Sequence, residues 1–146
     1  MVDYGDRECV GYRFALRGRA QEAMEALDAA CTYRFPDRIK PEDLELRTDN
    51  GSAFGAASFV AEVASQGLRL TKTFYRSPEG NAIVERFFRT LKEECVWQHQ
   101  FQSFAEAERI ITEWIRFYNE ERPHSALGYC SPKEYRRRQR EKGLAA

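Results

Sequence analysis

The sequence predicts an α/β protein of about one domain, on three observations. In the first half of the chain, segments in which apolar and polar residues alternate, as in strands, are interleaved with segments of helical periodicity. Three helices with strong capping signals fill the second half. The 146 residues are 42% hydrophobic, which is enough apolar material for a core and argues against a disordered chain. The predicted order is strand, helix, strand, helix, strand and then three helices, a pattern with crossover connections.

Five elements alternate in the first half of the chain. Residues 8–16 alternate apolar with polar or small side chains, which predicts a strand. Residues 20–34 are strong helix formers, and Phe35-Pro36 ends the helix that they predict. The apolar face of this helix comprises Ala23, Leu27, Ala30 and Cys31. The other elements are a strand at 43–47, a helix at 56–66 closed by Gly67, and a strand at 68–74.

Each of the three later helices begins at a recognisable cap. Ser77-Pro78-Glu79 predicts the start of a helix over 79–97. Capping boxes at 103–106 and 131–134 predict helices over 103–121 and 132–142. The predicted core stripe of the first helix is Val84, Phe87, Phe88 and Leu91. The predicted apolar line of the second helix is Phe104, Ala107, Ile111, Trp114 and Tyr118.

The formal net charge is zero, but the charges are unevenly distributed. Residues 65–92 carry six basic and two acidic side chains, and residues 132–146 carry the same numbers. Residues 1–64 and 93–131 each have a net charge of −4, from 8 basic against 12 acidic and 3 against 7. The two basic segments indicate either a polyanion partner or ordinary solvated faces. No apolar run approaches the roughly 18 residues of a membrane span, and the acidic N-terminus argues against an export signal.

The four cysteines predict reduced thiols rather than a zinc site. Cys9, Cys31, Cys95 and Cys130 form no C-x-x-C pair, and the chain has two histidines, His99 and His124. Zinc sites of ordinary spacing need more closely spaced ligands. Thiols of this kind are typical of a cytosolic protein.

Two acidic residues are candidates for chemistry because of their positions. Asp49 follows a predicted strand, and ligands gather at the carboxyl ends of strands in open α/β sheets. Its Asp-Asn-Gly sequence is also typical of an ordinary turn. Glu85 shares a helix face with Arg89 and Lys92, at i, i+4 and i+7. That face is either a solvated surface with a Glu–Arg pair or a metal-dependent phosphodiester site, in which the acid holds a divalent ion and the cations hold nucleic-acid backbone.

Four segments of the chain resemble one family, in the family's order. Residues 46–54 (LRTDNGSAF) and 77–88 (SPEGNAIVERFF) resemble the second-aspartate and glutamate motifs of bacterial insertion-sequence transposases related to retroviral integrases. Thirty-five residues separate Asp49 from Glu85, which is the spacing of these Asp-Asp-Glu recombinases. Residues 118–132 are similar to the stretch that closes their core, and residues 2–12 to a hairpin near its start. The resemblance is to the second-reading-frame product of such elements.

The resemblance implies a ribonuclease H-like integrase core and two Mg²⁺ or Mn²⁺ ions held by two aspartates and a glutamate. Asp49 then corresponds to the second metal aspartate and Glu85 to the metal glutamate, so both are catalytic candidates. In the family, such ions activate the attacking oxygen and stabilise the leaving one. Asn81, Arg89 and Lys92 become candidates for DNA contact. The basic segments add further DNA-binding candidates: Arg69, Lys72, Arg76, Arg86, Arg136, Arg137, Arg138 and Arg140.

The resemblance also implies an N-terminally truncated core. The family's first metal aspartate lies on a strand before the hairpin that residues 2–12 resemble, and Asp3 matches the hairpin instead. The first strand and most of the second are expected to be missing, with residues 1–122 forming the partial core and 123–146 the closing segment and basic helix. We expect the chain alone to be marginally stable and inactive or nearly so. The strands at 8–16, 43–47 and 68–74 should belong to one sheet, either gapped or with 8–16 paired to 43–47.

Three functions remain open from the sequence. The first is a fragment of a transposase or integrase catalytic core that cuts and joins DNA. The second is a non-catalytic DNA- or partner-binding remnant that modulates a full-length transposase through mixed assembly. The third is a stand-alone ribonuclease H-like nuclease, against which the closing stretch argues. The implied partners are the DNA ends of the element, target DNA and other transposase copies, in the bacterial cytoplasm at the nucleoid.

Overall fold

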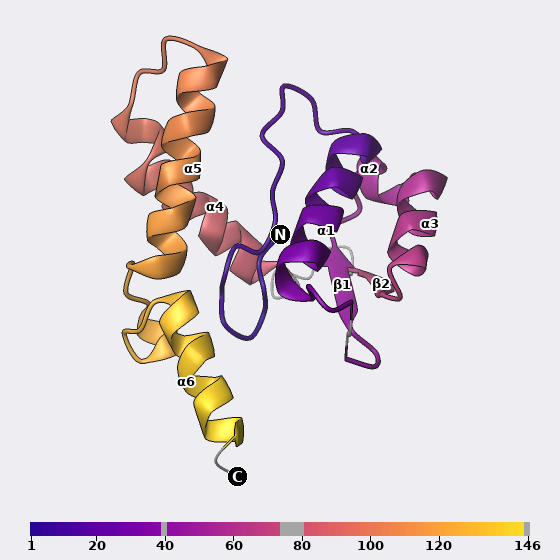
Figure 1. Ribbon diagram of the computed structural model, residues 1–146. Coiled ribbons are helices and arrows are strands. Elements are labelled where there is room, and N and C mark those ends of the chain that lie inside the picture. Colours follow the sequence, from indigo (N-terminus) through magenta and orange to yellow (C-terminus); the bar gives the residue numbers. More distant parts are fainter. Residues whose placement is uncertain (39–40, 74–80, 145–146) are drawn as a thin grey trace. The chain divides into compact units, whose positions relative to one another are not determined.

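The computed structural model describes residues 1–38, 41–73 and 81–144 (Figure 1). The chain divides into two compact units. The first comprises Met1 and Val10–Val84, and the second comprises Val2–Cys9 and Glu85–Ala146. Each unit has its own hydrophobic cluster, so each is described by itself.

The first unit is built on a parallel pair of strands with three helices. Its elements in chain order are α1 (Ala20–Arg34), β1 (Glu45–Thr48), α2 (Ser52–Gly55), α3 (Ala57–Ser65) and β2 (Arg69–Lys72). The register of the strands runs from Glu45 opposite Arg69 to Thr48 opposite Lys72. Leu27 and Cys31 of α1 pack with Phe59 and Val63 of α3, and these four side chains form the core of the unit. The helices predicted at 20–34 and 56–66 are therefore confirmed.

Gly67 makes the tight connection between α3 and β2. Its φ is +69°, a left-handed conformation that glycine adopts without the penalty of a Cβ. The N–H of Leu68 donates to the carbonyl of Val63 at 3.1 Å, which closes the helix end. β2 runs from Arg69 to Lys72, so the predicted strand at 68–74 is confirmed within the residues that the structure describes.

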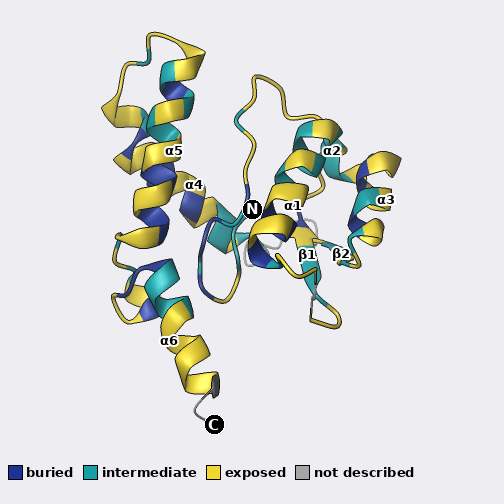
Figure 2. Ribbon diagram, viewed as in Figure 1, coloured by how far each residue is buried: buried dark blue, intermediate teal, exposed yellow. Residues whose placement is uncertain are grey.

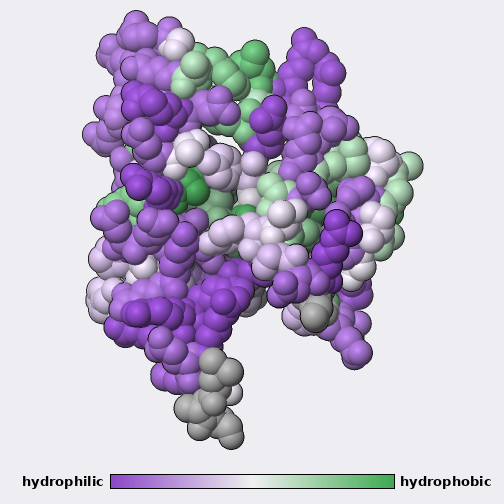
Figure 3. Space-filling view, viewed as in Figure 1, coloured by the Kyte–Doolittle hydropathy of each residue, from purple (hydrophilic) through white to green (hydrophobic). Residues whose placement is uncertain are grey.

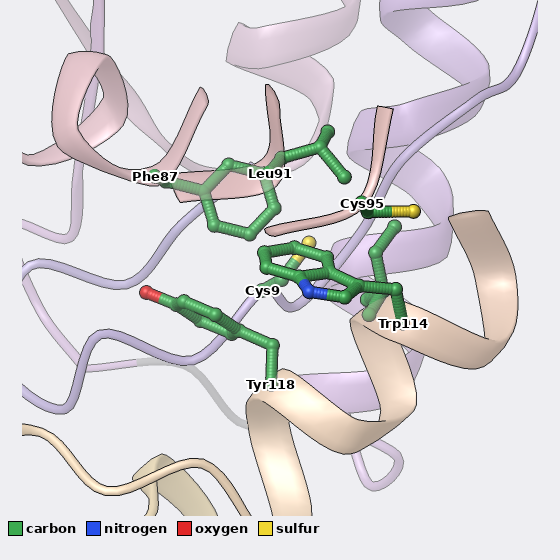
Figure 4. Packing of buried hydrophobic residues seen from close by; sticks show 7 residues of the cluster. Cys9, Phe87, Leu91, Cys95, Trp114 and Tyr118 are labelled. Carbon is green, nitrogen blue, oxygen red and sulfur yellow. The ribbon is translucent and has the colours of Figure 1, made fainter. Parts of the chain in front are cut away.

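The second unit is helical. Its elements are α4 (Ala82–Glu94, which begins in the first unit), the 3₁₀ turns η1 (Val96–Gln98) and η2 (Ser125–Leu127), α5 (Phe104–Glu120) and α6 (Pro132–Leu144). Phe87, Leu91 and Cys95 pack against Trp114 and Tyr118, as Figure 4 shows. Cys9 and Ile115 complete this buried cluster. Buried positions of α4 and α5 are dark blue in Figure 2.

The aromatic side chains of this cluster contact one another, edge to face between Phe87 and Tyr118 and with tilted planes between Trp114 and Tyr118. The ring centroids of Phe87 and Tyr118 are 5.0 Å apart with their planes at 89°, and those of Trp114 and Tyr118 are 5.3 Å apart. Aromatic pairs at such distances add roughly 0.5–1.5 kcal/mol beyond the burial of their area. The cluster therefore fixes α4 against α5.

Both capping boxes that the structure describes form their predicted side-chain bond. Ser103 Oγ accepts the N–H of Glu106 at 3.1 Å, and Ser131 Oγ accepts the N–H of Glu134 at 3.3 Å. The helices predicted at 103–121 and 132–142 are confirmed. The predicted cap at 77–79 lies outside the described residues. No helix in the described ranges is both long and apolar enough to cross a membrane.

The strand predicted at 8–16 is wrong. The one pairing in this segment, within the described chain, is an isolated antiparallel bridge between Val2 and Cys9. The backbone N–H and C=O of Cys9 are bound by the amide of Asn119 instead of a neighbouring strand. Further on, Gly11 packs against the backbone of α1. The sheet of the described residues therefore has two strands, β1 and β2. Residues 8–16 take part in neither expected arrangement, a gapped sheet or a pairing with 43–47.

The predicted core stripe of α4 is partly wrong because its buried face is rotated from the predicted one. In α4, Phe87, Thr90 and Leu91 are buried, whereas Phe88 is 51% exposed and Val84 is half-buried. The buried cluster at Phe87, Leu91 and Cys95 follows i, i+4, i+8, which leaves Phe88 about 100° away on the helix. In the line predicted for α5, Ala107, Trp114 and Tyr118 are buried as expected. Phe104, at the start of that line, is 41% exposed. Ile115 is buried on that helix and was not predicted.

Candidate functional site

Asp49 lies directly after β1, at the carboxyl end of the parallel strand pair, as the sequence predicted. Its side chain is exposed, and Oδ1 accepts the N–H of Gly51 at 2.8 Å. The next residue, Asn50, donates from Nδ2 to the carbonyl of Thr73 at 3.0 Å, which ties the turn to the end of β2. The aspartate thus forms an ordinary turn, and its Oδ2 has no hydrogen bond among the described residues. The turn and ligand interpretations are compatible, because the turn uses one oxygen and leaves the other.

Glu85 lies in the first turn of α4 and is exposed. A carboxylate is favourable there because the helix N-terminus carries partial positive charge. The surface pair with Arg89 that the spacing allowed is not formed. Arg89 Nε donates to Glu93 Oε1 at 2.8 Å instead. Within the described ranges the exposed Glu85 carboxylate makes no ion pair. Asn81 is half-buried one turn earlier, just before α4 begins.

The two carboxylates have the donor chemistry of a magnesium or manganese site. Hard cations of this kind prefer carboxylate oxygens. Across the described residues, however, no group of three or more His, Cys, Asp or Glu side chains could hold a metal ion. Asp49 belongs to the first unit and Glu85 to the second. The chain therefore has two exposed carboxylates, one in the turn after β1 and one in the first turn of α4.

The predicted DNA-binding side chains are mostly exposed. Lys72 ends β2, Arg86 and Lys92 lie on the outer side of α4, and all three are exposed. On α6, Arg137 is exposed, whereas Arg136 is half-buried and pairs with Asp6 at 3.3 Å. Figure 3 shows a continuous hydrophilic surface over α6. Arg76 lies outside the described residues.

An open groove of about 510 Å³ runs between α6 and the loop at residues 3–6 of the same unit. Its lining residues are Asp3, Gly5, Asp6, Tyr135, Arg136, Gln139 and Arg140. Asp3 Oδ1 accepts the N–H groups of Gly5 and Asp6, so this carboxylate supports the loop. The ion pair of Asp6 with Arg136 crosses the groove and leaves Arg140 as its exposed cation.

The stretch at 118–132, which resembles the family's closing stretch, has a structural role that sequence analysis did not assign. Asn119 is buried, and its amide makes two hydrogen bonds with the backbone of Cys9. Arg122 donates to both carboxylate oxygens of Glu94, at 2.6 Å from Nη2 and 2.8 Å from Nε. His124 packs edge to face on Tyr118, with ring centroids 4.7 Å apart. An asparagine in the last turn of an otherwise apolar helix face was the one available signal.

Burial and pairing shift the pKa values in this stretch. The hydrogen bonds from Arg122 hold the pKa of Glu94 below its usual range. Desolvation lowers the pKa of His124 and raises the pKa of Tyr118 to about 12. Burial thus disfavours the charged form of both side chains. The stretch connects α5 to the Val2–Cys9 segment through Asn119 and to α4 through Arg122, which is a structural role.

Solved structures of integrases have the same fold. The catalytic core domain of BIV integrase is 21% identical, with a TM-score of 0.59 over 88% of this chain and 78% of that one. An intasome of simian T-cell lymphotropic virus, solved with the PP2A regulatory subunit B56 gamma, gives a TM-score of 0.64 at 17% identity, over 83% of this chain and 41% of that one. The fold is therefore the ribonuclease H-like integrase core, as expected.

Sequence relatives define the family more closely. The integrase core domain family matches residues 66–132. The InsD transposases of insertion elements IS2E and IS2A/D/F/H/I/K, from Escherichia coli, are each 32% identical over 145 residues, or 99% of this chain. The chain spans 66% and 48% of their lengths, about half to two thirds of these curated relatives. The chain belongs to the bacterial insertion-sequence transposases with an integrase-like core.

Proposed function

We propose that this chain forms part of a transposase catalytic core that cuts and joins DNA by metal-dependent phosphoryl transfer. The observation that carries the proposal is the position of Asp49, exposed at the carboxyl end of β1 with one oxygen uncommitted, in a chain whose relatives are named transposases. Glu85, on the first turn of α4, is the second proposed ligand. The proposal includes a location in the bacterial cytoplasm at the nucleoid, where the DNA is.

The proposed roles follow from the geometry of each side chain. The Gly51 N–H fixes the Asp49 carboxylate through Oδ1, so that Oδ2 is presented in one direction. Glu85 is presented by a helix whose opposite side is buried at Phe87 and Leu91. When bound, Mg²⁺ or Mn²⁺ would supply neutralisation of the charge that develops at phosphorus. In-line displacement then depends mainly on how the reacting groups are positioned and on the surrounding charge. The exposed cations of α4 and β2 would contribute by binding the phosphate backbone.

A metal-binding experiment tests the two carboxylates directly. Mn²⁺ added to the purified chain should broaden the amide NMR signals of residues 49–51 and 82–86. Asp49→Asn keeps an acceptor for the Gly51 N–H but removes the charge, and Glu85→Gln does the same on α4. Each should weaken Mn²⁺ binding at least about tenfold, since even partners outside the ligand shell contribute 10–100-fold in metal sites.

Asp43→Asn is the matched control for this experiment. Asp43 is also exposed but precedes β1, at the opposite end of the strand pair from Asp49. Its φ of +57° is one that asparagine tolerates, so the fold should be kept. Broadening around Asp49 that survives both Asp49→Asn and Glu85→Gln would refute the assignment of these two ligands.

A salt titration tests the proposed DNA surface on α4. Arg89→Gln with Lys92→Gln should weaken binding of a labelled duplex and lower the slope of log affinity against log salt by about 1–2. Arg109→Gln with Arg116→Gln removes the same charge from α5, and Arg109 pairs with Glu113 as Arg89 pairs with Glu93. This control should leave the slope unchanged. Equal losses in both double variants would mean that α4 makes no dedicated phosphate contact.

The second candidate function is a non-catalytic DNA- or partner-binding protein that modulates a full-length transposase. It is favoured by the lack, among the described residues, of any cluster of three metal-binding side chains. Under this alternative the salt-dependent binding of DNA remains, but Asp49→Asn and Glu85→Gln leave Mn²⁺ binding unchanged. Strand transfer by the chain alone is expected to be barely measurable, because two carboxylates make an incomplete two-ion site.

A further inference from the structure

The turn between His124 and Cys130 is built as a rigid support. The N–H of His124 donates to the carbonyl of Cys130 at 3.1 Å, and the N–H groups of Leu127 and Tyr129 both donate to the carbonyl of His124 at 2.9 Å. Leu127 and Cys130 are buried beneath the turn. Because its ends are bonded and its base is packed, the turn holds the residue at its tip in one position.

That residue is Tyr129, and its presentation is unusual. Its side chain is 77% exposed, and its φ is +62°. Bulky side chains rarely adopt this left-handed conformation, which persists where the surrounding structure imposes it and which points to a functional constraint. Within the described chain, the ring of Tyr129 makes no hydrogen bond and no ring contact. The turn therefore holds an aromatic face in solvent, at a backbone position that would suit glycine or asparagine better.

The charge next to the turn indicates what the exposed ring would meet. α6 begins at Pro132, three residues after Tyr129, and residues 132–146 carry six basic side chains against two acidic ones. Lys133 and Arg137, at i and i+4, lie on the same side of α6. Lys133 contacts Glu120, whereas Arg137 is exposed. A flat aromatic face beside a cationic helix fits a ligand with flat rings and negative charge, which is single-stranded nucleic acid.

We propose that Tyr129 is a stacking platform for an unpaired nucleobase, with the α6 cations holding the adjacent phosphates. This inference rests on the proposed function, because it takes DNA as the ligand. It goes further in naming an unstacked base, such as one at a frayed or cleaved strand end, as the feature bound. Stacking on an aromatic ring tolerates any base, so the site selects single-stranded over duplex DNA rather than a sequence.

The test compares a labelled single-stranded oligothymidine with a duplex of equal length, by fluorescence polarisation on the full chain. Tyr129→Ala should weaken single-strand binding about 5- to 150-fold, the range measured when one stacking aromatic is removed. Binding of the duplex should change less than twofold. Tyr129→Phe keeps the ring and should retain single-strand binding within about threefold.

Tyr129→Asn separates stacking from folding. Asparagine tolerates the left-handed backbone better than tyrosine, so this variant should melt at the same temperature or higher while losing single-strand binding as Tyr129→Ala does. Trp97→Ala is the control, because Trp97 is 68% exposed in the same unit but lies in η1, away from α6 in sequence. It should bind like the unchanged chain.

The outcomes distinguish the two proposals. Salt-dependent duplex binding with no single-strand loss in Tyr129→Ala or Tyr129→Asn overturns the stacking platform and leaves the proposed function standing. Failure of the unchanged chain to bind either DNA overturns both. Loss of self-association in Tyr129→Ala, measured by sedimentation, with unchanged DNA binding would assign the ring to a contact between protein chains and overturn the stacking proposal.

Discussion

Replacing Asn119 by alanine should lower the free energy of unfolding of the second unit by about 2–5 kcal/mol. The buried amide accepts the Cys9 N–H through Oδ1 at 2.8 Å and donates from Nδ2 to the Cys9 carbonyl at 2.9 Å. A hydrogen bond contributes about 1 kcal/mol net, but a buried group left without its partner costs about 1–3 kcal/mol. Alanine removes the partner of two backbone groups at once. The substitution also releases the segment Val2–Cys9 from α5, because the two hydrogen bonds of Asn119 attach this segment to the core.

Urea unfolding of the two units measures this cost, and two further variants define its cause. Asn50→Ala also removes an asparagine that donates to a backbone carbonyl, but at an exposed turn, so it should cost less than about 1 kcal/mol. Asn119→Asp keeps the acceptor for the Cys9 N–H and turns a second oxygen toward the Cys9 carbonyl. It should be at least as destabilising as alanine. If Asn119→Ala lowers the free energy of unfolding no more than Asn50→Ala does, Asn119 does not hold the Cys9 segment to the core.

The hydrogen bonds between Asn119 and Cys9 show why part of the fold could not be predicted from the sequence. The two residues that it joins are 110 positions apart, and no local pattern connects them. The strand prediction at 8–16 failed for the same reason, because alternation describes which side chains are apolar but not what binds the backbone. There the backbone of Cys9 binds the side-chain amide of Asn119, and its neighbours Glu8 and Val10 bind the backbone of residues 1–3. Gly11 packs closely on α1.

The helices were predictable because their signals are local. Ser103 and Ser131 cap their own helices through bonds to residues three positions later, and Phe35-Pro36 and Gly67 end helices that they adjoin. Which face of α4 is buried could not be predicted from its own sequence. Which of Phe87 and Phe88 is buried depends on where Trp114 and Tyr118 approach, and α5 sets that position.

The candidate site divides in the same way. Asp49 was predicted at a strand end because the strand and the turn are contiguous in sequence, and the structure confirms that position. The pairing of Arg89 was not predicted, since Glu85 and Glu93 are both one helical turn from it and the choice between them depends on side-chain rotamers. The choice of Glu93 leaves Glu85 without an ion pair among the described residues, which is the state that a metal ligand requires.

Replacing Gly11 by alanine should destabilise the first unit by about 1–3 kcal/mol, as overpacking of a close-packed contact does. A Cβ at this position would lie 2.5 Å from the carbonyl oxygen of Ala26 and 2.7 Å from both N and Cβ of Ala30. These are backbone atoms and the shortest of side chains, so they cannot rotate away. Relief would need a shift of α1, and Ala30 and Leu27 on that helix are buried. We therefore expect a cost near the upper end of this range.

Gly18→Ala is the matched control for this contact, because no heavy atom lies within 4 Å of a Cβ there and its φ is not in the left-handed range. It should be neutral or stabilising by up to about 1 kcal/mol, since alanine reduces the freedom of the unfolded chain. Thermal unfolding followed by circular dichroism compares the two variants. If Gly11→Ala melts no lower than Gly18→Ala, the segment after Cys9 is not held against α1. If Gly11→Ala melts well below Gly18→Ala, the close packing of this segment on α1 holds it in place. The alternating sequence of the same segment had predicted a strand.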